Sequence, residues 1–160
     1  MTLNTSNRRP AGEPTGSFLR DTGMLTLSIP ALPRPTLEEY QKEFYLIRDS
    51  APPPFARRIH WITSIVRDTS PIGAVKLVLG TIFPADDRKK RISGAEYQRR
   101  LAPHRNTLLG YQHAVFLEEN QTELPEFMAL LAGEKRITSI AFPGLIVKDR
   151  WGSLCFPSLV

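Results

Sequence analysis

Residues 58–67 read RIHWITSIVR, and residues 71–83, after a short turn, read PIGAVKLVLGTIF. In the first segment every second residue from Ile59 to Ile65 lies on one face, which is typical of a half-buried strand. In the second segment the apolar residues at 72, 75, 79 and 82 follow helical spacing, so we expect a buried helix. Strands and helices that succeed one another without a regular repeat predict an α+β fold.

Further elements are expected on both sides of this pair. Thr36 with Glu39, and Ser93 with Glu96, have the spacing of helix-capping boxes. The expected helices cover 36–48, 93–101 and 123–132, and the expected strands cover 107–118, 137–142, 144–148 and 153–156. The strand over 107–118 rests on a second alternating pattern, and the last three strands are separated by Pro-Gly and Asp-Arg-Trp-Gly turns.

The first 35 residues differ in composition from the remainder. Five prolines stand among glycine, serine, threonine and arginine, and few residues are apolar before position 24. We therefore expect residues 1–35 to form a flexible arm, within which 24–29 form a short docking strand. Residues 36–160 are expected to form a single compact domain, with a mostly antiparallel sheet packed by helices.

Composition limits the classes of function. The net charge of +5 and the pI near 9.7 favour anionic partners, which include lipid, nucleic acid or an acidic protein. A single cysteine, Cys155, excludes an intramolecular disulfide. No apolar run is long enough to span a bilayer, and the first residues lack the apolar core of a signal peptide, so we expect neither feature.

The strongest functional signal is a run of four cations: Arg88, Lys89, Lys90 and Arg91, with Arg8 and Arg9 as a secondary pair. Such a run binds an anionic membrane surface or nucleic acid, although it also occurs in plain solvated loops. The acidic stretch 118–134 has the opposite charge. Head-to-tail self-association would pair the two stretches, and so would neutralisation within one molecule.

Two further groups of residues bear on function. Pro52, Pro53, Pro54 and Phe55 favour an extended polyproline conformation and are a candidate partner-binding segment. The three histidines, His60, His104 and His113, have no metal-ligand spacing, so no catalytic site, metal or cofactor is expected. An enzyme would instead require a concave pocket that holds one of these histidines with a perturbed pKa.

Three segments resemble the matrix proteins of rhabdoviruses. GAVKLVLG (73–80) is similar to a helix of the lyssavirus type, HAVFLEENQTE (113–123) to the strand and acidic turn that follow a basic stretch, and FPGLIVKDRW (142–151) to the C-terminal strand of the vesiculovirus type. The resemblance covers roughly 58–160 with gaps. Phe55 stands where the family's PPxY budding motif has tyrosine, and only Arg8-Arg9 replace the lysine-rich arm.

The resemblance implies a non-enzymatic structural protein of virion assembly and budding. Such a protein self-associates, binds the anionic membrane surface and condenses the viral nucleocapsid. It is expected in the virion, in the host cytoplasm and at the inner membrane face, with the nucleus as a further location. Two alternatives are a soluble basic regulator that binds nucleic acid and a small enzyme with a dispersed active site.

Overall fold

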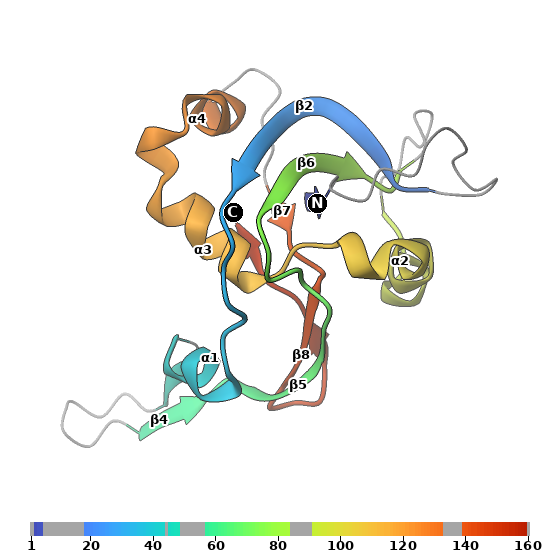
Figure 1. Ribbon diagram of the computed structural model, residues 1–160. Helices are drawn as coiled ribbons and strands as arrows, with labels where there is room; N and C mark the ends of the chain where they lie inside the picture. Colours follow the sequence, from blue (N-terminus) through green and yellow to red (C-terminus); the bar gives the residue numbers. More distant parts are fainter. Residues whose placement is uncertain are drawn as a thin grey trace.

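The computed structural model describes residues 2–4, 18–43, 45–48, 57–83, 91–132 and 139–159 (Figure 1). These residues form an α+β fold in which every pair of neighbouring strands is antiparallel. The predicted fold class is therefore confirmed. The strands are divided among four small sheets, with the orders β1-β6-β2, β5-β8-β9, β3-β4 and β10-β7.

The first three-stranded sheet contains β1 (Thr2–Asn4), β6 (Val75–Thr81) and β2 (Arg20–Ile29), with β6 in the centre. The long β2 arches over β6 (Figure 1), and its register shifts between Asp21 and Thr26, around Gly23 with a φ of 69°. The flexible arm predicted over 1–35 is wrong at residues 2–4, which form β1, and again from residue 18 onward. Every second residue from Leu25 to Ile29 is buried, so this segment belongs to the core rather than to a docking arm.

The helix predicted over 71–83 is also wrong, because its central residues form strand β6. Val75 and Leu79 are four residues apart, a spacing that puts them on one face of either a helix or a strand. Leu77 and Val78 are buried too, since both faces of this strand are covered. A strand that is buried on both faces is a continuous apolar run, which periodicity alone does not distinguish from a buried helix.

A layer of helices covers one face of the sheet formed by β2 and β6. It comprises α3 (Tyr111–Glu119), the 3₁₀ turn η2 (Gln121–Glu123) and α4 (Pro125–Ala132). Ala114, Leu117, Phe127 and Leu130 pack against the sheet. The strand predicted over 107–118 is wrong: from Tyr111 the buried side chains follow helical spacing, at 113, 114 and 117.

The second three-stranded sheet contains β5 (Ile62–Asp68), β8 (Leu145–Asp149) and β9 (Leu154–Cys155). The predicted strand over 58–67 is divided into β5 and β4 (Arg57–His60), with Trp61 between them. Two register shifts interrupt the pairing of β5 with β8. The single buried face predicted for Ile59 to Ile65 is therefore wrong, because Ile62 is buried whereas Thr63 is exposed.

The two faces of this sheet follow from its register. Paired residues share a face, so each face is defined by the side chains that it carries. The inner face carries Ile62, Ile65, Leu145, Val147, Asp149 and Cys155. The outer face carries Ser64, Arg67, Ile146, Lys148 and Leu154. Leu145, Val147 and Ile62 pack with Tyr40 of α1 (Leu37–Glu43) in a separate apolar cluster.

The remaining elements confirm several local predictions. The Thr36 side chain accepts a hydrogen bond from the Glu39 amide at 3.3 Å, and Glu39 accepts one from the Thr36 amide at 2.7 Å, so the capping box begins α1. This helix ends at Glu43, earlier than predicted, because β3 (Tyr45–Arg48) pairs with β4. Ser93 caps α2 (Gly94–Leu101), which continues as the 3₁₀ helix η1 (Ala102–Thr107) from the residue before Pro103.

Three of the C-terminal strands lie near their predicted positions with different bounds, and β10 was not predicted. β7 (Ile140–Ala141) pairs with β10 (Ser158–Leu159), and the turns at Pro143-Gly144 and Asp149–Gly152 flank β8. Gly144 packs directly against the backbone of Leu108 and Leu109, and its amide donates to the Leu109 carbonyl at 2.8 Å. This close contact joins the second sheet to the start of α3.

Candidate functional site

A groove lies on each face of the β5-β8-β9 sheet. The inner-face groove has a volume of about 620 Å³, and the outer-face groove has a volume of about 450 Å³. Alternate residues of β8 and β9 line the two grooves, with Val147 and Cys155 on one side and Ile146 and Leu154 on the other. Phe156 lines both. The two surfaces differ in charge.

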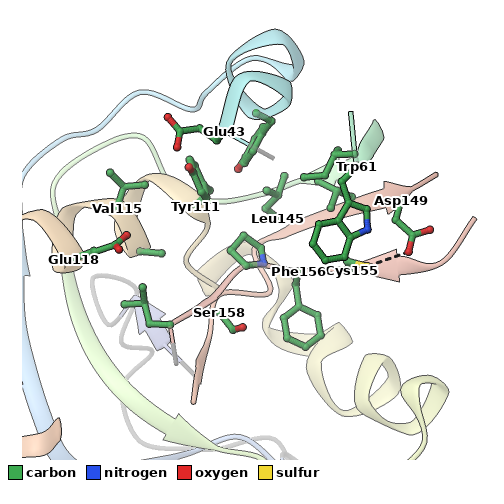
Figure 2. A pocket seen from close by; sticks show the side chains of 16 residues that line it. Glu43, Trp61, Tyr111, Val115, Glu118, Leu145, Asp149, Cys155, Phe156 and Ser158 are labelled. Carbon is green, nitrogen blue, oxygen red and sulfur yellow. Dashed lines mark hydrogen bonds between the residues drawn. The ribbon is translucent and has the colours of Figure 1, made fainter. Parts of the chain in front are cut away.

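The inner groove is aromatic. α1 contributes Tyr40, α3 contributes Tyr111, and Trp61 and Phe156 come from the chain next to β5 and β9 (Figure 2). The rings of Tyr40 and Tyr111 lie 4.6 Å apart between centroids, at 53°. Leu145 and Val147 line the groove from the sheet. This volume and this mixture of aromatic and aliphatic walls are typical of binding sites for apolar groups.

The charged side chains that line the inner groove are all acidic: Glu43, Glu118 and Asp149. Burial raises the pKa of Tyr111, and the charge and hydrogen bond of Glu43 and the charges of Glu118 and Glu119 act in the same direction, so that together they raise it to about 12. Figure 2 shows Glu43 and Glu118 on either side of Tyr111. The groove therefore favours a ligand that combines apolar groups with positive charge.

Asp149 has a structural role at one end of this groove. One of its carboxylate oxygens accepts hydrogen bonds from the backbone amides of Trp151 at 2.9 Å and Ser153 at 2.8 Å, which shape the turn between β8 and β9. Burial raises the pKa of the neighbouring Cys155 thiol, and the Asp149 carboxylate raises it further. Cys155 is therefore held as a thiol, and an activated cysteine nucleophile requires the opposite shift.

Two exposed tryptophans mark the edge of the inner groove. Trp61 is 41% exposed and Trp151 is 63% exposed, and their rings meet edge to face with centroids 6.1 Å apart. The Arg150 guanidinium lies over the Trp151 ring at 5.4 Å. Large exposed aromatic side chains beside a groove are typical of protein interaction sites.

The outer face carries positive charge. Its charged side chains from the sheet, among the described residues, are Arg67 and Lys148. η1 lies beside the end of β5, because the Thr69 hydroxyl donates to the Arg105 carbonyl at 2.8 Å. Arg91 directly precedes the residues of α2 that line the outer groove. Four cationic residues therefore belong to, or adjoin, this surface.

Arg67 has an unusual environment for an arginine. Its Nε atom is buried and has no hydrogen-bond partner among the described residues. Burial lowers the pKa of Arg67, and the positive charge of Arg105 lowers it further. Because two guanidinium groups that repel one another are stabilised by an anion between them, this arrangement favours an anionic ligand.

No histidine lines the described part of either groove. His113 is completely buried in α3, and its Nδ1 accepts a hydrogen bond from the Gly110 amide at 3.2 Å. Burial lowers the pKa of His113 to about 4. Its perturbed pKa thus accompanies a position in the core, not the pocket position that the enzyme alternative requires. Among the described residues, no cluster of acidic, histidine or cysteine side chains could hold a metal ion.

Most of the site residues predicted from the sequence lie outside the described residues: Arg88, Lys89, Lys90, Arg8, Arg9, Pro52, Pro53, Pro54 and Phe55. Arg91 is described and exposed, next to the outer groove. The sequence analysis missed the inner groove, because its walls come from four distant segments. The available signal was Trp61 and Trp151, two large aromatic residues in polar surroundings.

Within the described ranges, no helix has both the length and the apolar character that crossing a bilayer requires. Comparison of the chain with family models, with curated proteins and with solved structures finds no match.

Proposed function

We propose that this chain is a non-enzymatic binding protein that attaches to an anionic surface through the outer face of its β5-β8-β9 sheet. The observation that carries the proposal is the charge of that face: its charged side chains from the sheet, among the described residues, are Arg67 and Lys148, and the buried Arg67 Nε has no hydrogen-bond partner there. Lys148 and Arg91 extend the same charge, and the cationic run Arg88–Lys90 joins the chain directly before Arg91.

In its most specific form, the proposal is a matrix-like protein that self-associates and bridges an anionic membrane surface and a viral nucleocapsid. Each cation near an anionic bilayer contributes about 1 kcal/mol, so a face with four such residues suffices for peripheral attachment. Within the segment 142–151, which resembles the family's C-terminal strand, Leu145–Asp149 form strand β8. Residues 73–80, which resemble a helix of the family, lead into and form strand β6 instead, and residues 113–123, which resemble a strand and turn, lie in α3 and η2. Neither of these two parts of the resemblance supports the proposal.

The nucleic-acid alternative has weaker support. Tyr97 follows the basic run in the sequence, but its ring stacks on Phe156 with centroids 5.1 Å apart, at 11°. Its face toward Phe156 is therefore not open to a base. Binding to nucleic acid would depend on phosphate contacts alone, which give steep salt dependence and no sequence preference.

Flotation of the purified full chain with liposomes tests the proposal. Neutral and phosphatidylserine-rich vesicles are compared at low and high salt. The variant Arg105→Glu/Lys148→Glu removes charge from the outer face, and Lys42→Glu/Lys76→Glu, on other surfaces, makes the same change in net charge. A third variant replaces Arg88, Lys89, Lys90 and Arg91 by alanine.

We expect binding to anionic vesicles alone, weakened by salt and by the outer-face variant but not by its control. Equal loss in both double variants would mean that net charge, rather than this face, carries the attachment. If no vesicle is bound but RNA is bound in a salt-sensitive way, the nucleic-acid alternative replaces the membrane proposal. Binding to neither would overturn the anionic-partner proposal.

A further inference from the structure

The inner groove is open and aromatic, its charged side chains are acidic, and attachment to an anionic surface does not use it. We propose that it receives the proline-rich segment 51–58, Ala-Pro-Pro-Pro-Phe-Ala-Arg-Arg, of a second copy of this chain. The inference is independent of attachment to an anionic partner, because the groove lies on the opposite face of the β5-β8-β9 sheet from the cationic surface.

The chemistry of the groove matches this segment. Proline-rich segments dock on grooves lined by aromatic rings, since the polyproline conformation loses little entropy on binding. Tyr40, Trp61, Tyr111 and Phe156 supply such rings. Pro52, Pro53, Pro54 and Phe55 supply apolar side chains without an acidic residue among them.

Charge sets the register of the proposed contact. The segment ends in two cations, Arg57 and Arg58, and Arg48 is paired with Arg57 at the same end of the β3-β4 hairpin. The groove offers Glu43 and Glu118 and has no basic residue in its described lining. A cationic proline-rich end and an acidic aromatic groove are therefore complementary in charge as well as in shape.

The topology favours docking between molecules rather than within one. In the β3-β4 hairpin, Tyr45 pairs with His60 next to Trp61, which lines the groove, and Arg48 pairs with Arg57 at the opposite end. The segment joins the described hairpin at this distant end, about 10 Å along the strand from the groove side. Figure 1 shows β4 at the edge of the molecule. To enter the groove of its own molecule, the segment would have to turn back along the hairpin. The groove of a neighbouring molecule requires no such reversal.

Such a contact joins two different surfaces of identical chains. Each copy carries one segment and one groove, so the contact is heterologous and does not close into a symmetric dimer. Growth therefore continues from both ends with rising concentration. The prediction is specific: one intact groove and one intact segment are sufficient for one contact.

Sedimentation velocity of the full chain over a hundredfold range of concentration tests the contact. A groove variant carries Glu43→Lys and Glu118→Lys, and a segment variant carries Pro52→Ser, Pro54→Ser and Phe55→Ser. The matched control, Glu123→Lys/Glu126→Lys, changes two exposed acids of η2 and α4 that do not line the groove.

We expect the wild type and the control to form species that grow with concentration, and each of the other two variants to remain monomeric. Their equimolar mixture should form a dimer and stop there, because only one groove and one segment remain compatible. Growth of either variant alone would overturn the proposal, as would a monomeric wild type over the whole range.

A synthetic peptide of residues 50–58, SAPPPFARR, provides the second measurement. Its addition to the full chain should change tryptophan fluorescence saturably, because Trp61 lines the groove. The groove variant should bind about tenfold more weakly or worse, and a peptide with alanine for the three prolines should lose binding to a similar extent. If the peptide binds but the wild type stays monomeric, the groove serves a proline-rich segment of another protein, and self-association is overturned.

The same variants separate this inference from the proposed function. Glu43→Lys/Glu118→Lys should leave vesicle flotation at least as strong as in the wild type, since it alters the face opposite Arg67 and Lys148. Loss of flotation without loss of self-association would reject attachment alone, and the reverse result would reject the docked segment alone.

Discussion

The buried histidine of α3 leads to a quantitative prediction about acid stability. His113 is completely buried, its Nδ1 accepts a hydrogen bond from the Gly110 amide, and its Nε2 has no partner among the described residues. Burial lowers its pKa from 6.5 to about 4, and the charge of Asp68 offsets this only in part. The ring is therefore neutral in the folded protein at neutral pH.

The sign and size of the effect follow from proton linkage. Below pH 6.5 the unfolded chain binds a proton at this histidine, and the folded chain binds it only near pH 4. The contribution of the neutral His113 ring to the free energy of unfolding is thus fully present above pH 6.5, and it is lost as the pH decreases toward 4. At about 1.36 kcal/mol for each pH unit, the loss approaches about 3 kcal/mol, a large part of the typical stability of a small domain.

Urea unfolding at several pH values between 7 and 4, followed by the fluorescence of Trp61 and Trp151, measures this loss. His113→Asn keeps an acceptor near the position of Nδ1 but does not titrate. Its free energy of unfolding should be lower than that of the wild type at pH 7, and the difference should shrink by about 3 kcal/mol by pH 4. His104→Asn, at a partly exposed site in η1, controls for the loss of a histidine. Parallel pH profiles of the wild type and His113→Asn would refute the reasoning, and so would an NMR titration of the His113 ring near pH 6.5.

Three further predictions concern single side chains. Gly144→Ala places a Cβ in contact with the Leu108 carbonyl oxygen and 2.7 Å from that of Leu109, so chemical denaturation should show a loss of about 2–4 kcal/mol, whereas Gly73→Ala, with open space around it, should change stability little. The Arg99 and Arg100 side chains, through hydrogen bonds, lower the pKa of Glu96 to about 2. In acid titration the wild type should therefore lose stability between pH 4.5 and 2. Glu96→Gln should make this loss smaller, and the control Glu126→Gln should leave it unchanged. Because burial and Asp149 raise the pKa of Cys155, a thiol reagent at pH 8 should modify it several-fold more slowly in the folded chain than in urea, and equal rates would contradict the described environment.

Local signals in the sequence predicted their elements well. The Thr36–Glu39 box begins α1, Ser93 begins α2, and the turns at 143–144 and 149–152 lie between the terminal strands. Each of these signals depends on a hydrogen bond or a backbone angle within four residues, so distant contacts change it little. The fold class followed from these elements and from their irregular order.

Two longer segments were exchanged between helix and strand for a common physical reason. In β6 both faces are buried, and in α3 polar residues such as Gln112 and His113 lie in the core. Hydrophobic periodicity assumes one apolar and one polar face, so it is misleading in both cases. Intrinsic preference separates the two segments only in part: 75–81 holds two valines and a threonine, which favour strands, beside two leucines and a lysine, whereas 112–119 holds the helix formers Gln, Ala, Leu and two Glu.

The candidate grooves could not be predicted from the sequence for a different reason. Tyr40, Trp61, Tyr111 and Phe156 are separated by 21 to 50 positions in order along the chain and meet only through the packing of α1 and α3 on the β5-β8-β9 sheet. A charge run is visible in one segment, whereas a groove exists only after distant segments have folded together. The sequence therefore predicted a site at residues 88–91 but neither of the two grooves.

The separation of charge on this protein is made by the sheet rather than by the charge runs of the sequence. Lys148 and Asp149 are consecutive residues of β8, yet the alternation of the strand directs Lys148 to the outer face and Asp149 to the inner groove. Arg67 joins the first, and Glu43 and Glu118 join the second. Opposite charges on opposite faces of one thin sheet allow the inner groove to receive a cationic segment while the outer face stays free for an anionic partner. A one-residue shift in the register of β8 would exchange the two faces, so the pairing of β8 with β5 determines which charges face the groove.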